Sequence, residues 1–124
     1  MQRPIDQHTA LIFTMVLVSA AEGEMTDAEL EMIGRQVRYL PVFRSFDHQR
    51  LPDVGRDCAD LLRHDDGLEV ASEMIAEALP QPLRETAYAL ACDVAAADGT
   101  LDPAELEVLG LLRRRLNVDR LVAA

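Results

Sequence analysis

The chain is poor in aromatic residues, cysteine and catalytic motifs. It has no tryptophan and only two cysteines, Cys58 and Cys92, which lie far apart and form no CxxC pair. We therefore expect free thiols and a reducing, cytoplasmic setting. The sequence also has no GxSxG, P-loop or HExxH motif. The protein is accordingly predicted not to be an enzyme.

Basic residues are also scarce. Twelve of them face 22 acidic ones, which gives a net charge of −10 and a pI near 4.6. Such a field repels phosphate backbones, so nucleic acid is excluded as a ligand. Cations and basic protein surfaces are the partners that this charge attracts.

No apolar run is long enough to span a membrane. The longest, from Ala10 to Ala21, covers about a dozen residues where a bilayer needs roughly twenty. The opening MQRPIDQHTA has no apolar core, so no signal peptide is expected. A length of 124 residues fits a single domain, residues 1–124. Alanine, leucine, glutamate, arginine and methionine, all good helix formers, dominate and predict an all-α compact bundle.

The chain contains one sequence motif that occurs twice. Residues 18–34 read VSAAEGEMTDAELEMIG, and residues 94–110 read VAAADGTLDPAELEVLG. The offset is 76 residues without a gap, and nine of the seventeen positions are identical. We therefore predict an internal pseudo-two-fold repeat, with units at about 5–40 and 82–116, in a bundle of about seven helices. The expected helices cover about 5–21, 26–40, 42–46, 52–63, 68–79, 82–97 and 103–116.

Each copy places an acidic turn between two helices. Gly23 and Gly99 suit the left-handed residue that ends a helix. Thr26 with Glu29, and Asp102 with Glu105, have the spacing of a capping box, which starts the next helix. In the helix after the first turn, one apolar stripe is expected at Leu30, Ile33, Val37 and Leu40.

The two turns also resemble half of a calcium-binding loop. Acid, glycine, an apolar residue and a final glutamate match the second half of an EF-hand. The first and third loop positions would be Val94 and Ala96, which cannot bind a hard cation, so neither turn is a complete EF-hand. If the fold brings the turns together, they can share one ion. The predicted ligands of that shared site are Glu22, Glu29, Asp98 and Glu105, with Asp27 and Asp102 nearby.

Oxygen ligands of this kind favour calcium or magnesium over zinc. The alternative is a purely structural role, because capping alone accounts for Thr26, Glu29, Asp102 and Glu105. Capping gives no reason for Glu22 and Asp98, which lie at helix C-termini, where negative charge is mildly unfavourable. A third alternative, a hydrolytic metal enzyme, would need an open cleft beside the turns.

Several further residues leave alternatives open. The cluster Arg113, Arg114 and Arg115 is either a solvated helix face or a weak partner-binding patch. Asp93 falls within an apolar helix, where it is either buried with a partner or exposed on a narrow polar side. Gly34 and Gly110, inside two helices, are expected to allow close packing on the preceding apolar helix.

The segments 19–34 and 95–110 resemble the TerB-like family of tellurite-resistance proteins, which is similar in turn to the N-terminal domain of a DnaJ-type membrane co-chaperone. The order of helices agrees over nearly the whole chain. The resemblance implies about seven helices, acidic turns as a divalent-cation or interaction site, and a non-enzymatic role in stress response. It also implies a protein partner in a membrane-linked complex, for a cytoplasmic protein or one peripheral to the inner membrane. At Glu22 the chain departs from the family pattern, which favours aspartate there.

Overall fold

The computed structural model describes residues 4–21, 23, 25–97, 99 and 102–118. These residues form six α-helices and two short 3-10 helices, with no strand among them. The elements are α1 (Gln7–Ser19), α2 (Asp27–Tyr39), η1 (Pro41–Phe43), η2 (His48–Arg50), α3 (Leu51–Leu62), α4 (Gly67–Ala78), α5 (Gln81–Ala95) and α6 (Pro103–Arg115). The predicted all-α bundle is confirmed, and the predicted count of about seven helices is close.

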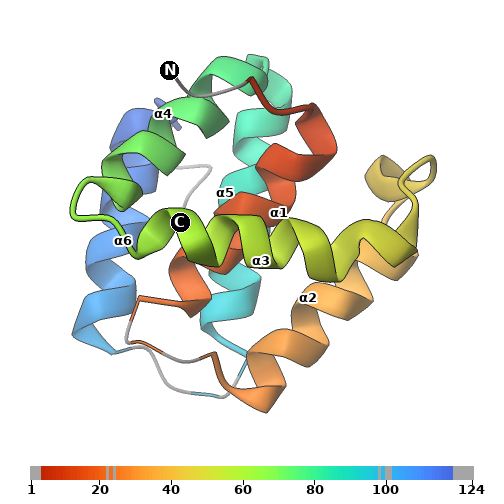
Figure 1. The fold of residues 1–124 in the computed structure, drawn as a ribbon, viewed down its shortest axis with the longest axis horizontal. Coiled ribbons are helices and arrows are strands. Elements are labelled where there is room, and N and C mark those ends of the chain that lie inside the picture. The colour runs from red at the N-terminus through yellow and green to blue at the C-terminus, as the bar shows by residue number, and fades with distance from the viewer. Residues whose placement is uncertain (1–3, 22, 24, 98, 100–101, 119–124) are drawn as a thin grey trace.

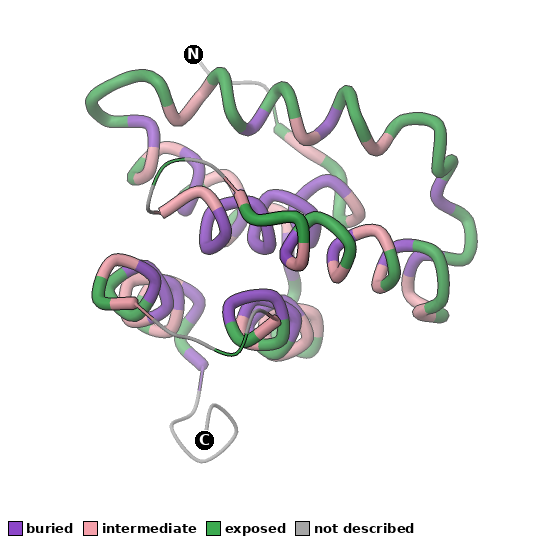
Figure 2. The backbone as a smooth tube through the Cα atoms, turned by 90° about the horizontal axis from the view of Figure 1, so that it is seen from below, coloured by how far each residue is buried: buried purple, intermediate pink, exposed green. Residues whose placement is uncertain are grey.

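Helix α1 is the centre of the bundle. Every residue from Thr9 to Ser19 is buried, and the other helices surround this segment (Figures 1 and 2). The hydroxyls of Thr14 and Ser19 donate to the carbonyls of Ala10 and Met15, at 2.7 and 2.8 Å. These bonds within the helix allow polar side chains to enter an apolar core without loss of hydrogen bonding. No helix in the described part of the chain is long and apolar enough to cross a membrane.

The apolar stripe of α2 differs from the prediction at one position. Ile33 and Val37 are buried, but the side chain of Leu30 is 48% exposed. The inward position at that level of the helix belongs to Glu29, four residues before Ile33 on the same face. The prediction for Leu30 was therefore wrong, because a carboxylate and not a leucine faces the core there.

The segment between α2 and α4 is irregular at both ends. Residues 41–50 form the two 3-10 turns, with Phe43 and Phe46 buried. Gly67 begins α4, and a side chain at this position would overlap the backbone of Leu61 and Leu62. On α3, Cys58 is fully buried, and burial raises the pKa of its thiol to about 12, so this thiol behaves as a core residue.

Helices α1 and α5 run side by side and point the same way. They form the most extensive helix contact in the bundle, both end at its lower side in Figure 1, and α2 and α6 both begin there. Gly23 and Gly99 follow α1 and α5 with φ of 123° and 83°, which confirms that both turns use the positive φ that glycine tolerates. The C-terminal ends of α1 and α5, with Gly23 and Gly99 after them, therefore lie on one side of the molecule.

Candidate cation site at the paired acidic turns

The four predicted ligands divide into two groups. Glu22 and Asp98 lie outside the described residues. Glu29 and Glu105 are the third residues of α2 and α6 and are described in full. The geometry of the site is therefore built on these two glutamates.

Both glutamates take part in complete capping boxes, as predicted. The amide of Thr26 donates to Glu29 Oε1 at 2.9 Å, and the amide of Glu29 donates to the Thr26 hydroxyl at 3.1 Å. In α6, the amide of Asp102 donates to Glu105 Oε1 at 3.4 Å, and the amide of Glu105 donates to Asp102 Oδ1 at 3.0 Å. These bonds fix each carboxylate against the first turn of its helix.

Capping does not account for the surroundings of the two carboxyls. Glu29 is 2% exposed and Glu105 is 3% exposed, whereas glutamate rarely becomes fully buried without a partner. Each has the other as its neighbour, because, after burial, the interaction with the Glu29 carboxyl is the largest cause that raises the pKa of Glu105. Two carboxyls so placed favour a state in which one of them holds a proton. The first turns of α2 and α6 therefore come together at a buried acid pair.

The pair holds that proton unusually tightly. Burial, followed by the hydrogen bond and the negative charge of Glu29 together with the charge of Asp102, raises the pKa of Glu105 from 4.5 to about 8. The hydrogen bond from the Asp102 amide acts in the opposite direction. Two carboxyls that share a site behave in this way because they cannot both ionise cheaply.

A divalent cation could replace that proton. Each carboxylate uses Oε1 for its cap and retains a second oxygen, and carboxylate oxygens are the ligands of calcium and magnesium. Within the described ranges no group of three or more His, Cys, Asp or Glu is arranged to hold a metal. Asp27 is exposed and Asp102 is half-buried at the two caps. The described part of the candidate site thus consists of two buried carboxyls.

Sequence reasoning missed that Glu29 and Glu105 are buried and in contact. The signal was present in the helical period. Glu29 lies four residues before Ile33, and Glu105 lies four residues before Leu109, so each shares the inward face of its helix. Because the two glutamates occupy corresponding positions in the two sequence copies, this period predicts that both of them face the core.

The remaining predicted features lie elsewhere. Arg115 is bound to Glu69 at 3.2 Å and to Glu73 at 3.3 Å, whereas Arg114 is exposed and Arg113 is half-buried. The arginine cluster therefore lies at the opposite end of α6 from Glu105.

The structure also describes Asp93 and the two helix glycines, Gly34 and Gly110. Asp93 is exposed and accepts a hydrogen bond from Gln36 at 3.3 Å. The expectation for Gly34 was wrong, because a side chain there would meet no atom within 4 Å, so close packing is not its reason. At Gly110 the nearest atom is the flexible end of Arg114, at 3.4 Å, and not the preceding helix.

Comparison with known proteins identifies a family. The family model described as "Tellurite resistance protein TerB" matches residues 8–121, which is nearly the whole chain. No curated protein and no solved structure matches this chain significantly.

Proposed function

Because the chain belongs to the TerB family of tellurite resistance proteins, we propose that it is a non-enzymatic binding module whose paired acidic turns bind a divalent cation. The observation that carries the proposal is the contact between the buried carboxyls of Glu29 and Glu105. Calcium or magnesium is the expected ion. In this proposal Glu22 and Asp98 complete the ligand set, and the module works in the cytoplasm or at the inner membrane surface with a protein partner.

In this mechanism a cation and a proton compete for the same carboxyl pair. Near neutral pH the raised pKa of Glu105 keeps one proton on the pair. The metal binds the deprotonated carboxylates, so binding releases a proton, and affinity rises as the pH approaches and passes about 8. A surface carboxylate with an ordinary pKa would release no proton in this range.

Titration calorimetry of the full chain with calcium, and separately with magnesium, tests the proposal. Repeating the titration in two buffers of different ionisation enthalpy counts the protons released. We expect saturable binding with close to one proton released at neutral pH. Absence of binding to either ion, together with an unchanged melting temperature, would refute the cation site.

Two variants localise the effect. Glu29→Gln and Glu105→Gln keep an oxygen that can accept the capping hydrogen bond but remove a charged ligand, so each is expected to abolish binding. Glu31→Gln is the matched control, because Glu31 lies two residues further along α2, is exposed and pairs with Arg35 at 3.4 Å. Equal losses in the Glu31 variant would indicate diffuse attraction to an acidic protein instead of a site.

A structural or adaptor role is the second candidate, and the two complete capping boxes favour it. Under this alternative, the glutamine variants fold and bind any partner as the parent protein does. The substitutions would then change only the stability of the protein, and there would be no ion binding for them to change.

A further inference from the structure

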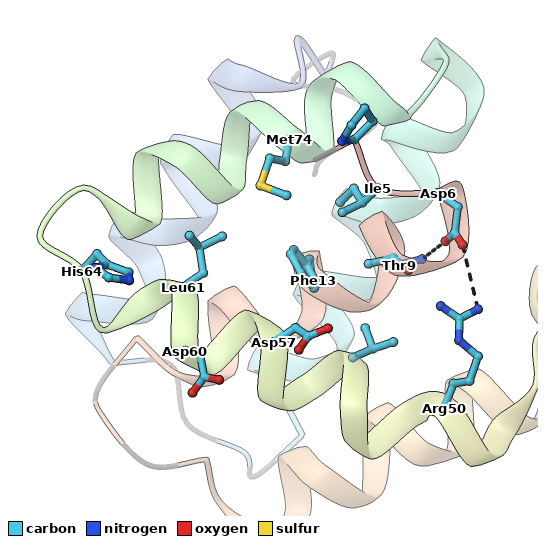
Figure 3. Close-up of a pocket in the computed structure, with 12 residues that line it drawn as sticks. Ile5, Asp6, Thr9, Phe13, Arg50, Asp57, Asp60, Leu61, His64 and Met74 are labelled. Carbon is cyan, nitrogen blue, oxygen red and sulfur yellow. Dashed lines mark hydrogen bonds and ion pairs between the residues drawn. The ribbon is translucent and has the colours of Figure 1, made fainter. Parts of the chain in front are cut away.

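An open groove between α3 and α4 lies at the other end of α1 from the acidic turns. It has a volume of about 680 Å³ and is floored by the first turns of α1. Figure 3 shows Phe13 facing the groove between Leu61 of α3 and Met74 of α4. A smaller hollow of about 90 Å³, beside Ile5, Met74 and Glu77, continues the groove along α4.

The rim of this groove is acidic. Asp57 and Asp60 project from α3, and Asp6 lies at the start of α1. Asp6 is paired with Arg50 at 3.9 Å, and Asp60 with Arg63 at 3.6 Å. No described residue forms an ion pair or a hydrogen bond with the exposed carboxylate of Asp57. The exposed carboxylate of Asp57 therefore lies on the rim of a mixed groove, whose partly exposed apolar residues include Ile5, Leu61 and Met74 and whose rim also carries Arg50 and His64.

This combination selects a partner by chemistry. A groove between two helices, with apolar residues inside it and polar ones along its rim, suits an amphipathic helix that lays its apolar face into it. The acidic rim, and the net charge of −10 around it, favour basic residues beside those apolar ones and disfavour a second copy of this acidic chain. We infer that the groove docks a basic amphipathic helix of a partner protein, with Lys or Arg beside Asp57 and an apolar side chain against Leu61 and Met74.

The probe is a short helical peptide of leucine and lysine, titrated into the full chain labelled with nitrogen-15. Saturable shifts are expected around Phe13, Asp57 and Met74. The same peptide with glutamate in place of lysine should not bind. Shifts centred on the acidic turns, binding of the glutamate peptide, or no saturable binding would each overturn the inference.

Two substitutions on α3 separate a site from general charge attraction. Asp57→Asn is expected to weaken binding about fivefold, as befits loss of one partly exposed ion pair. Asp53→Asn removes the same charge one turn earlier, from a carboxylate that pairs with Arg56 at 3.3 Å outside the groove, and should leave affinity within about twofold. Equal losses in the two variants would contradict a groove site.

Two further measurements test the location of the site and the choice of partner. Glu105→Gln should leave peptide affinity unchanged, because the acidic turns lie at the opposite end of α1, so failure of the cation proposal does not affect this one. A concentration-dependent dimer in analytical ultracentrifugation, abolished by Asp57→Asn, would assign the groove to a second copy and overturn the choice of partner.

Discussion

The two sequence copies, α1 with α2 and α5 with α6, share their turns but differ in their surroundings. Leu17 of α1 is 1% exposed, whereas Asp93, at the corresponding position of α5, is exposed to solvent and bound to Gln36. Val18 and Val94, one residue later, are both fully buried. The helix at the centre of the bundle is buried on every side, whereas the helix beside it has a polar, exposed side.

The starts of the second helices differ in charge. The neutral hydroxyl of Thr26 caps α2, whereas the carboxylate of Asp102 caps α6. The acid beside Glu105 is thus the cap itself, whereas the acid beside Glu29 is Asp27, one residue after the cap. The charge of Asp102 contributes to the raised pKa of Glu105. Equal capping geometry thus gives unequal electrostatics in the two copies.

The largest expected effect on stability comes from exchanging Leu17 of α1 and Asp93 of α5, which occupy corresponding positions in the two copies. Leu17→Asp buries a carboxylate with no designed partner in the core and should destabilise the protein by about 3–5 kcal/mol. Asp93→Leu replaces an exposed carboxylate and should change stability by less than about 1 kcal/mol. Urea unfolding followed by circular dichroism measures both. Similar losses in the two variants would show that the environments of α1 and α5 do not differ as described.

The second prediction concerns the pH dependence of stability. Because the pKa of Glu105 is about 8 in the folded state and 4.5 ordinarily, the folded protein binds more protons between these values. The free energy of unfolding should therefore fall as the pH rises from about 4.5 to about 8, by at most about 1.4 kcal/mol per unit. The contribution is fully present below the lower value and lost above the upper one.

Glu105→Gln removes this titration and supplies an amide that can donate to Glu29. The difference in stability between variant and parent should grow with pH across that window, and the variant should be the more stable protein above about pH 8. Urea unfolding at several pH values, with Glu107→Gln as an exposed control on α6, makes the comparison. Parallel curves for all three proteins would contradict the shared proton.

A smaller effect is expected from exchanging the caps. Asp102→Thr gives α6 the cap of α2 and should lower the pKa of Glu105, since one negative neighbour is lost. Thr26→Asp adds a charge near the pair and should raise it. Carboxyl carbon-13 titration measures the shift, and a remote change such as Asp53→Asn should not move it. Stability should change by less than about 1 kcal/mol, because threonine and aspartate both cap helices well.

The smallest effect is expected at the paired helix glycines. Gly34→Ala should stabilise the protein by about 0.5–1 kcal/mol, because alanine favours helix and the new methyl group meets no atom within 4 Å. Gly110→Ala should give a similar or slightly smaller gain, since its methyl group would contact Arg114. Thermal unfolding of the two variants checks this, and a loss of stability at Gly34 would restore close packing as the reason for that glycine.

The features that depend on neighbouring residues were predictable from the sequence. Both capping boxes, the glycines with positive φ and the helical class follow from local spacing and composition. The family was identified from the doubled segments. Local patterns could not give the relative direction of α1 and α5, because that direction depends on packing between segments 76 residues apart.

The prediction for Leu30 failed for a related reason. An apolar residue was assigned to the inward face and a carboxylate to the cap, but Glu29 does both, because a second buried carboxyl is available across the bundle. From the sequence, the functional question lay with Glu22 and Asp98. The burial of Glu29 and Glu105 extends that question to two residues that capping had seemed to explain completely.

The convergence of α2 and α6 on this pair has a consequence for charge balance. Each helix start carries a partial positive charge of about half an elementary unit, so the two ends together offset about one of the two carboxylate charges. The cap carboxylate of Asp102 adds a third negative charge beside Glu105, so a single proton still leaves the centre with a net negative charge of about one unit. A divalent ion in place of the proton would bring the same centre close to neutral, without any further acid.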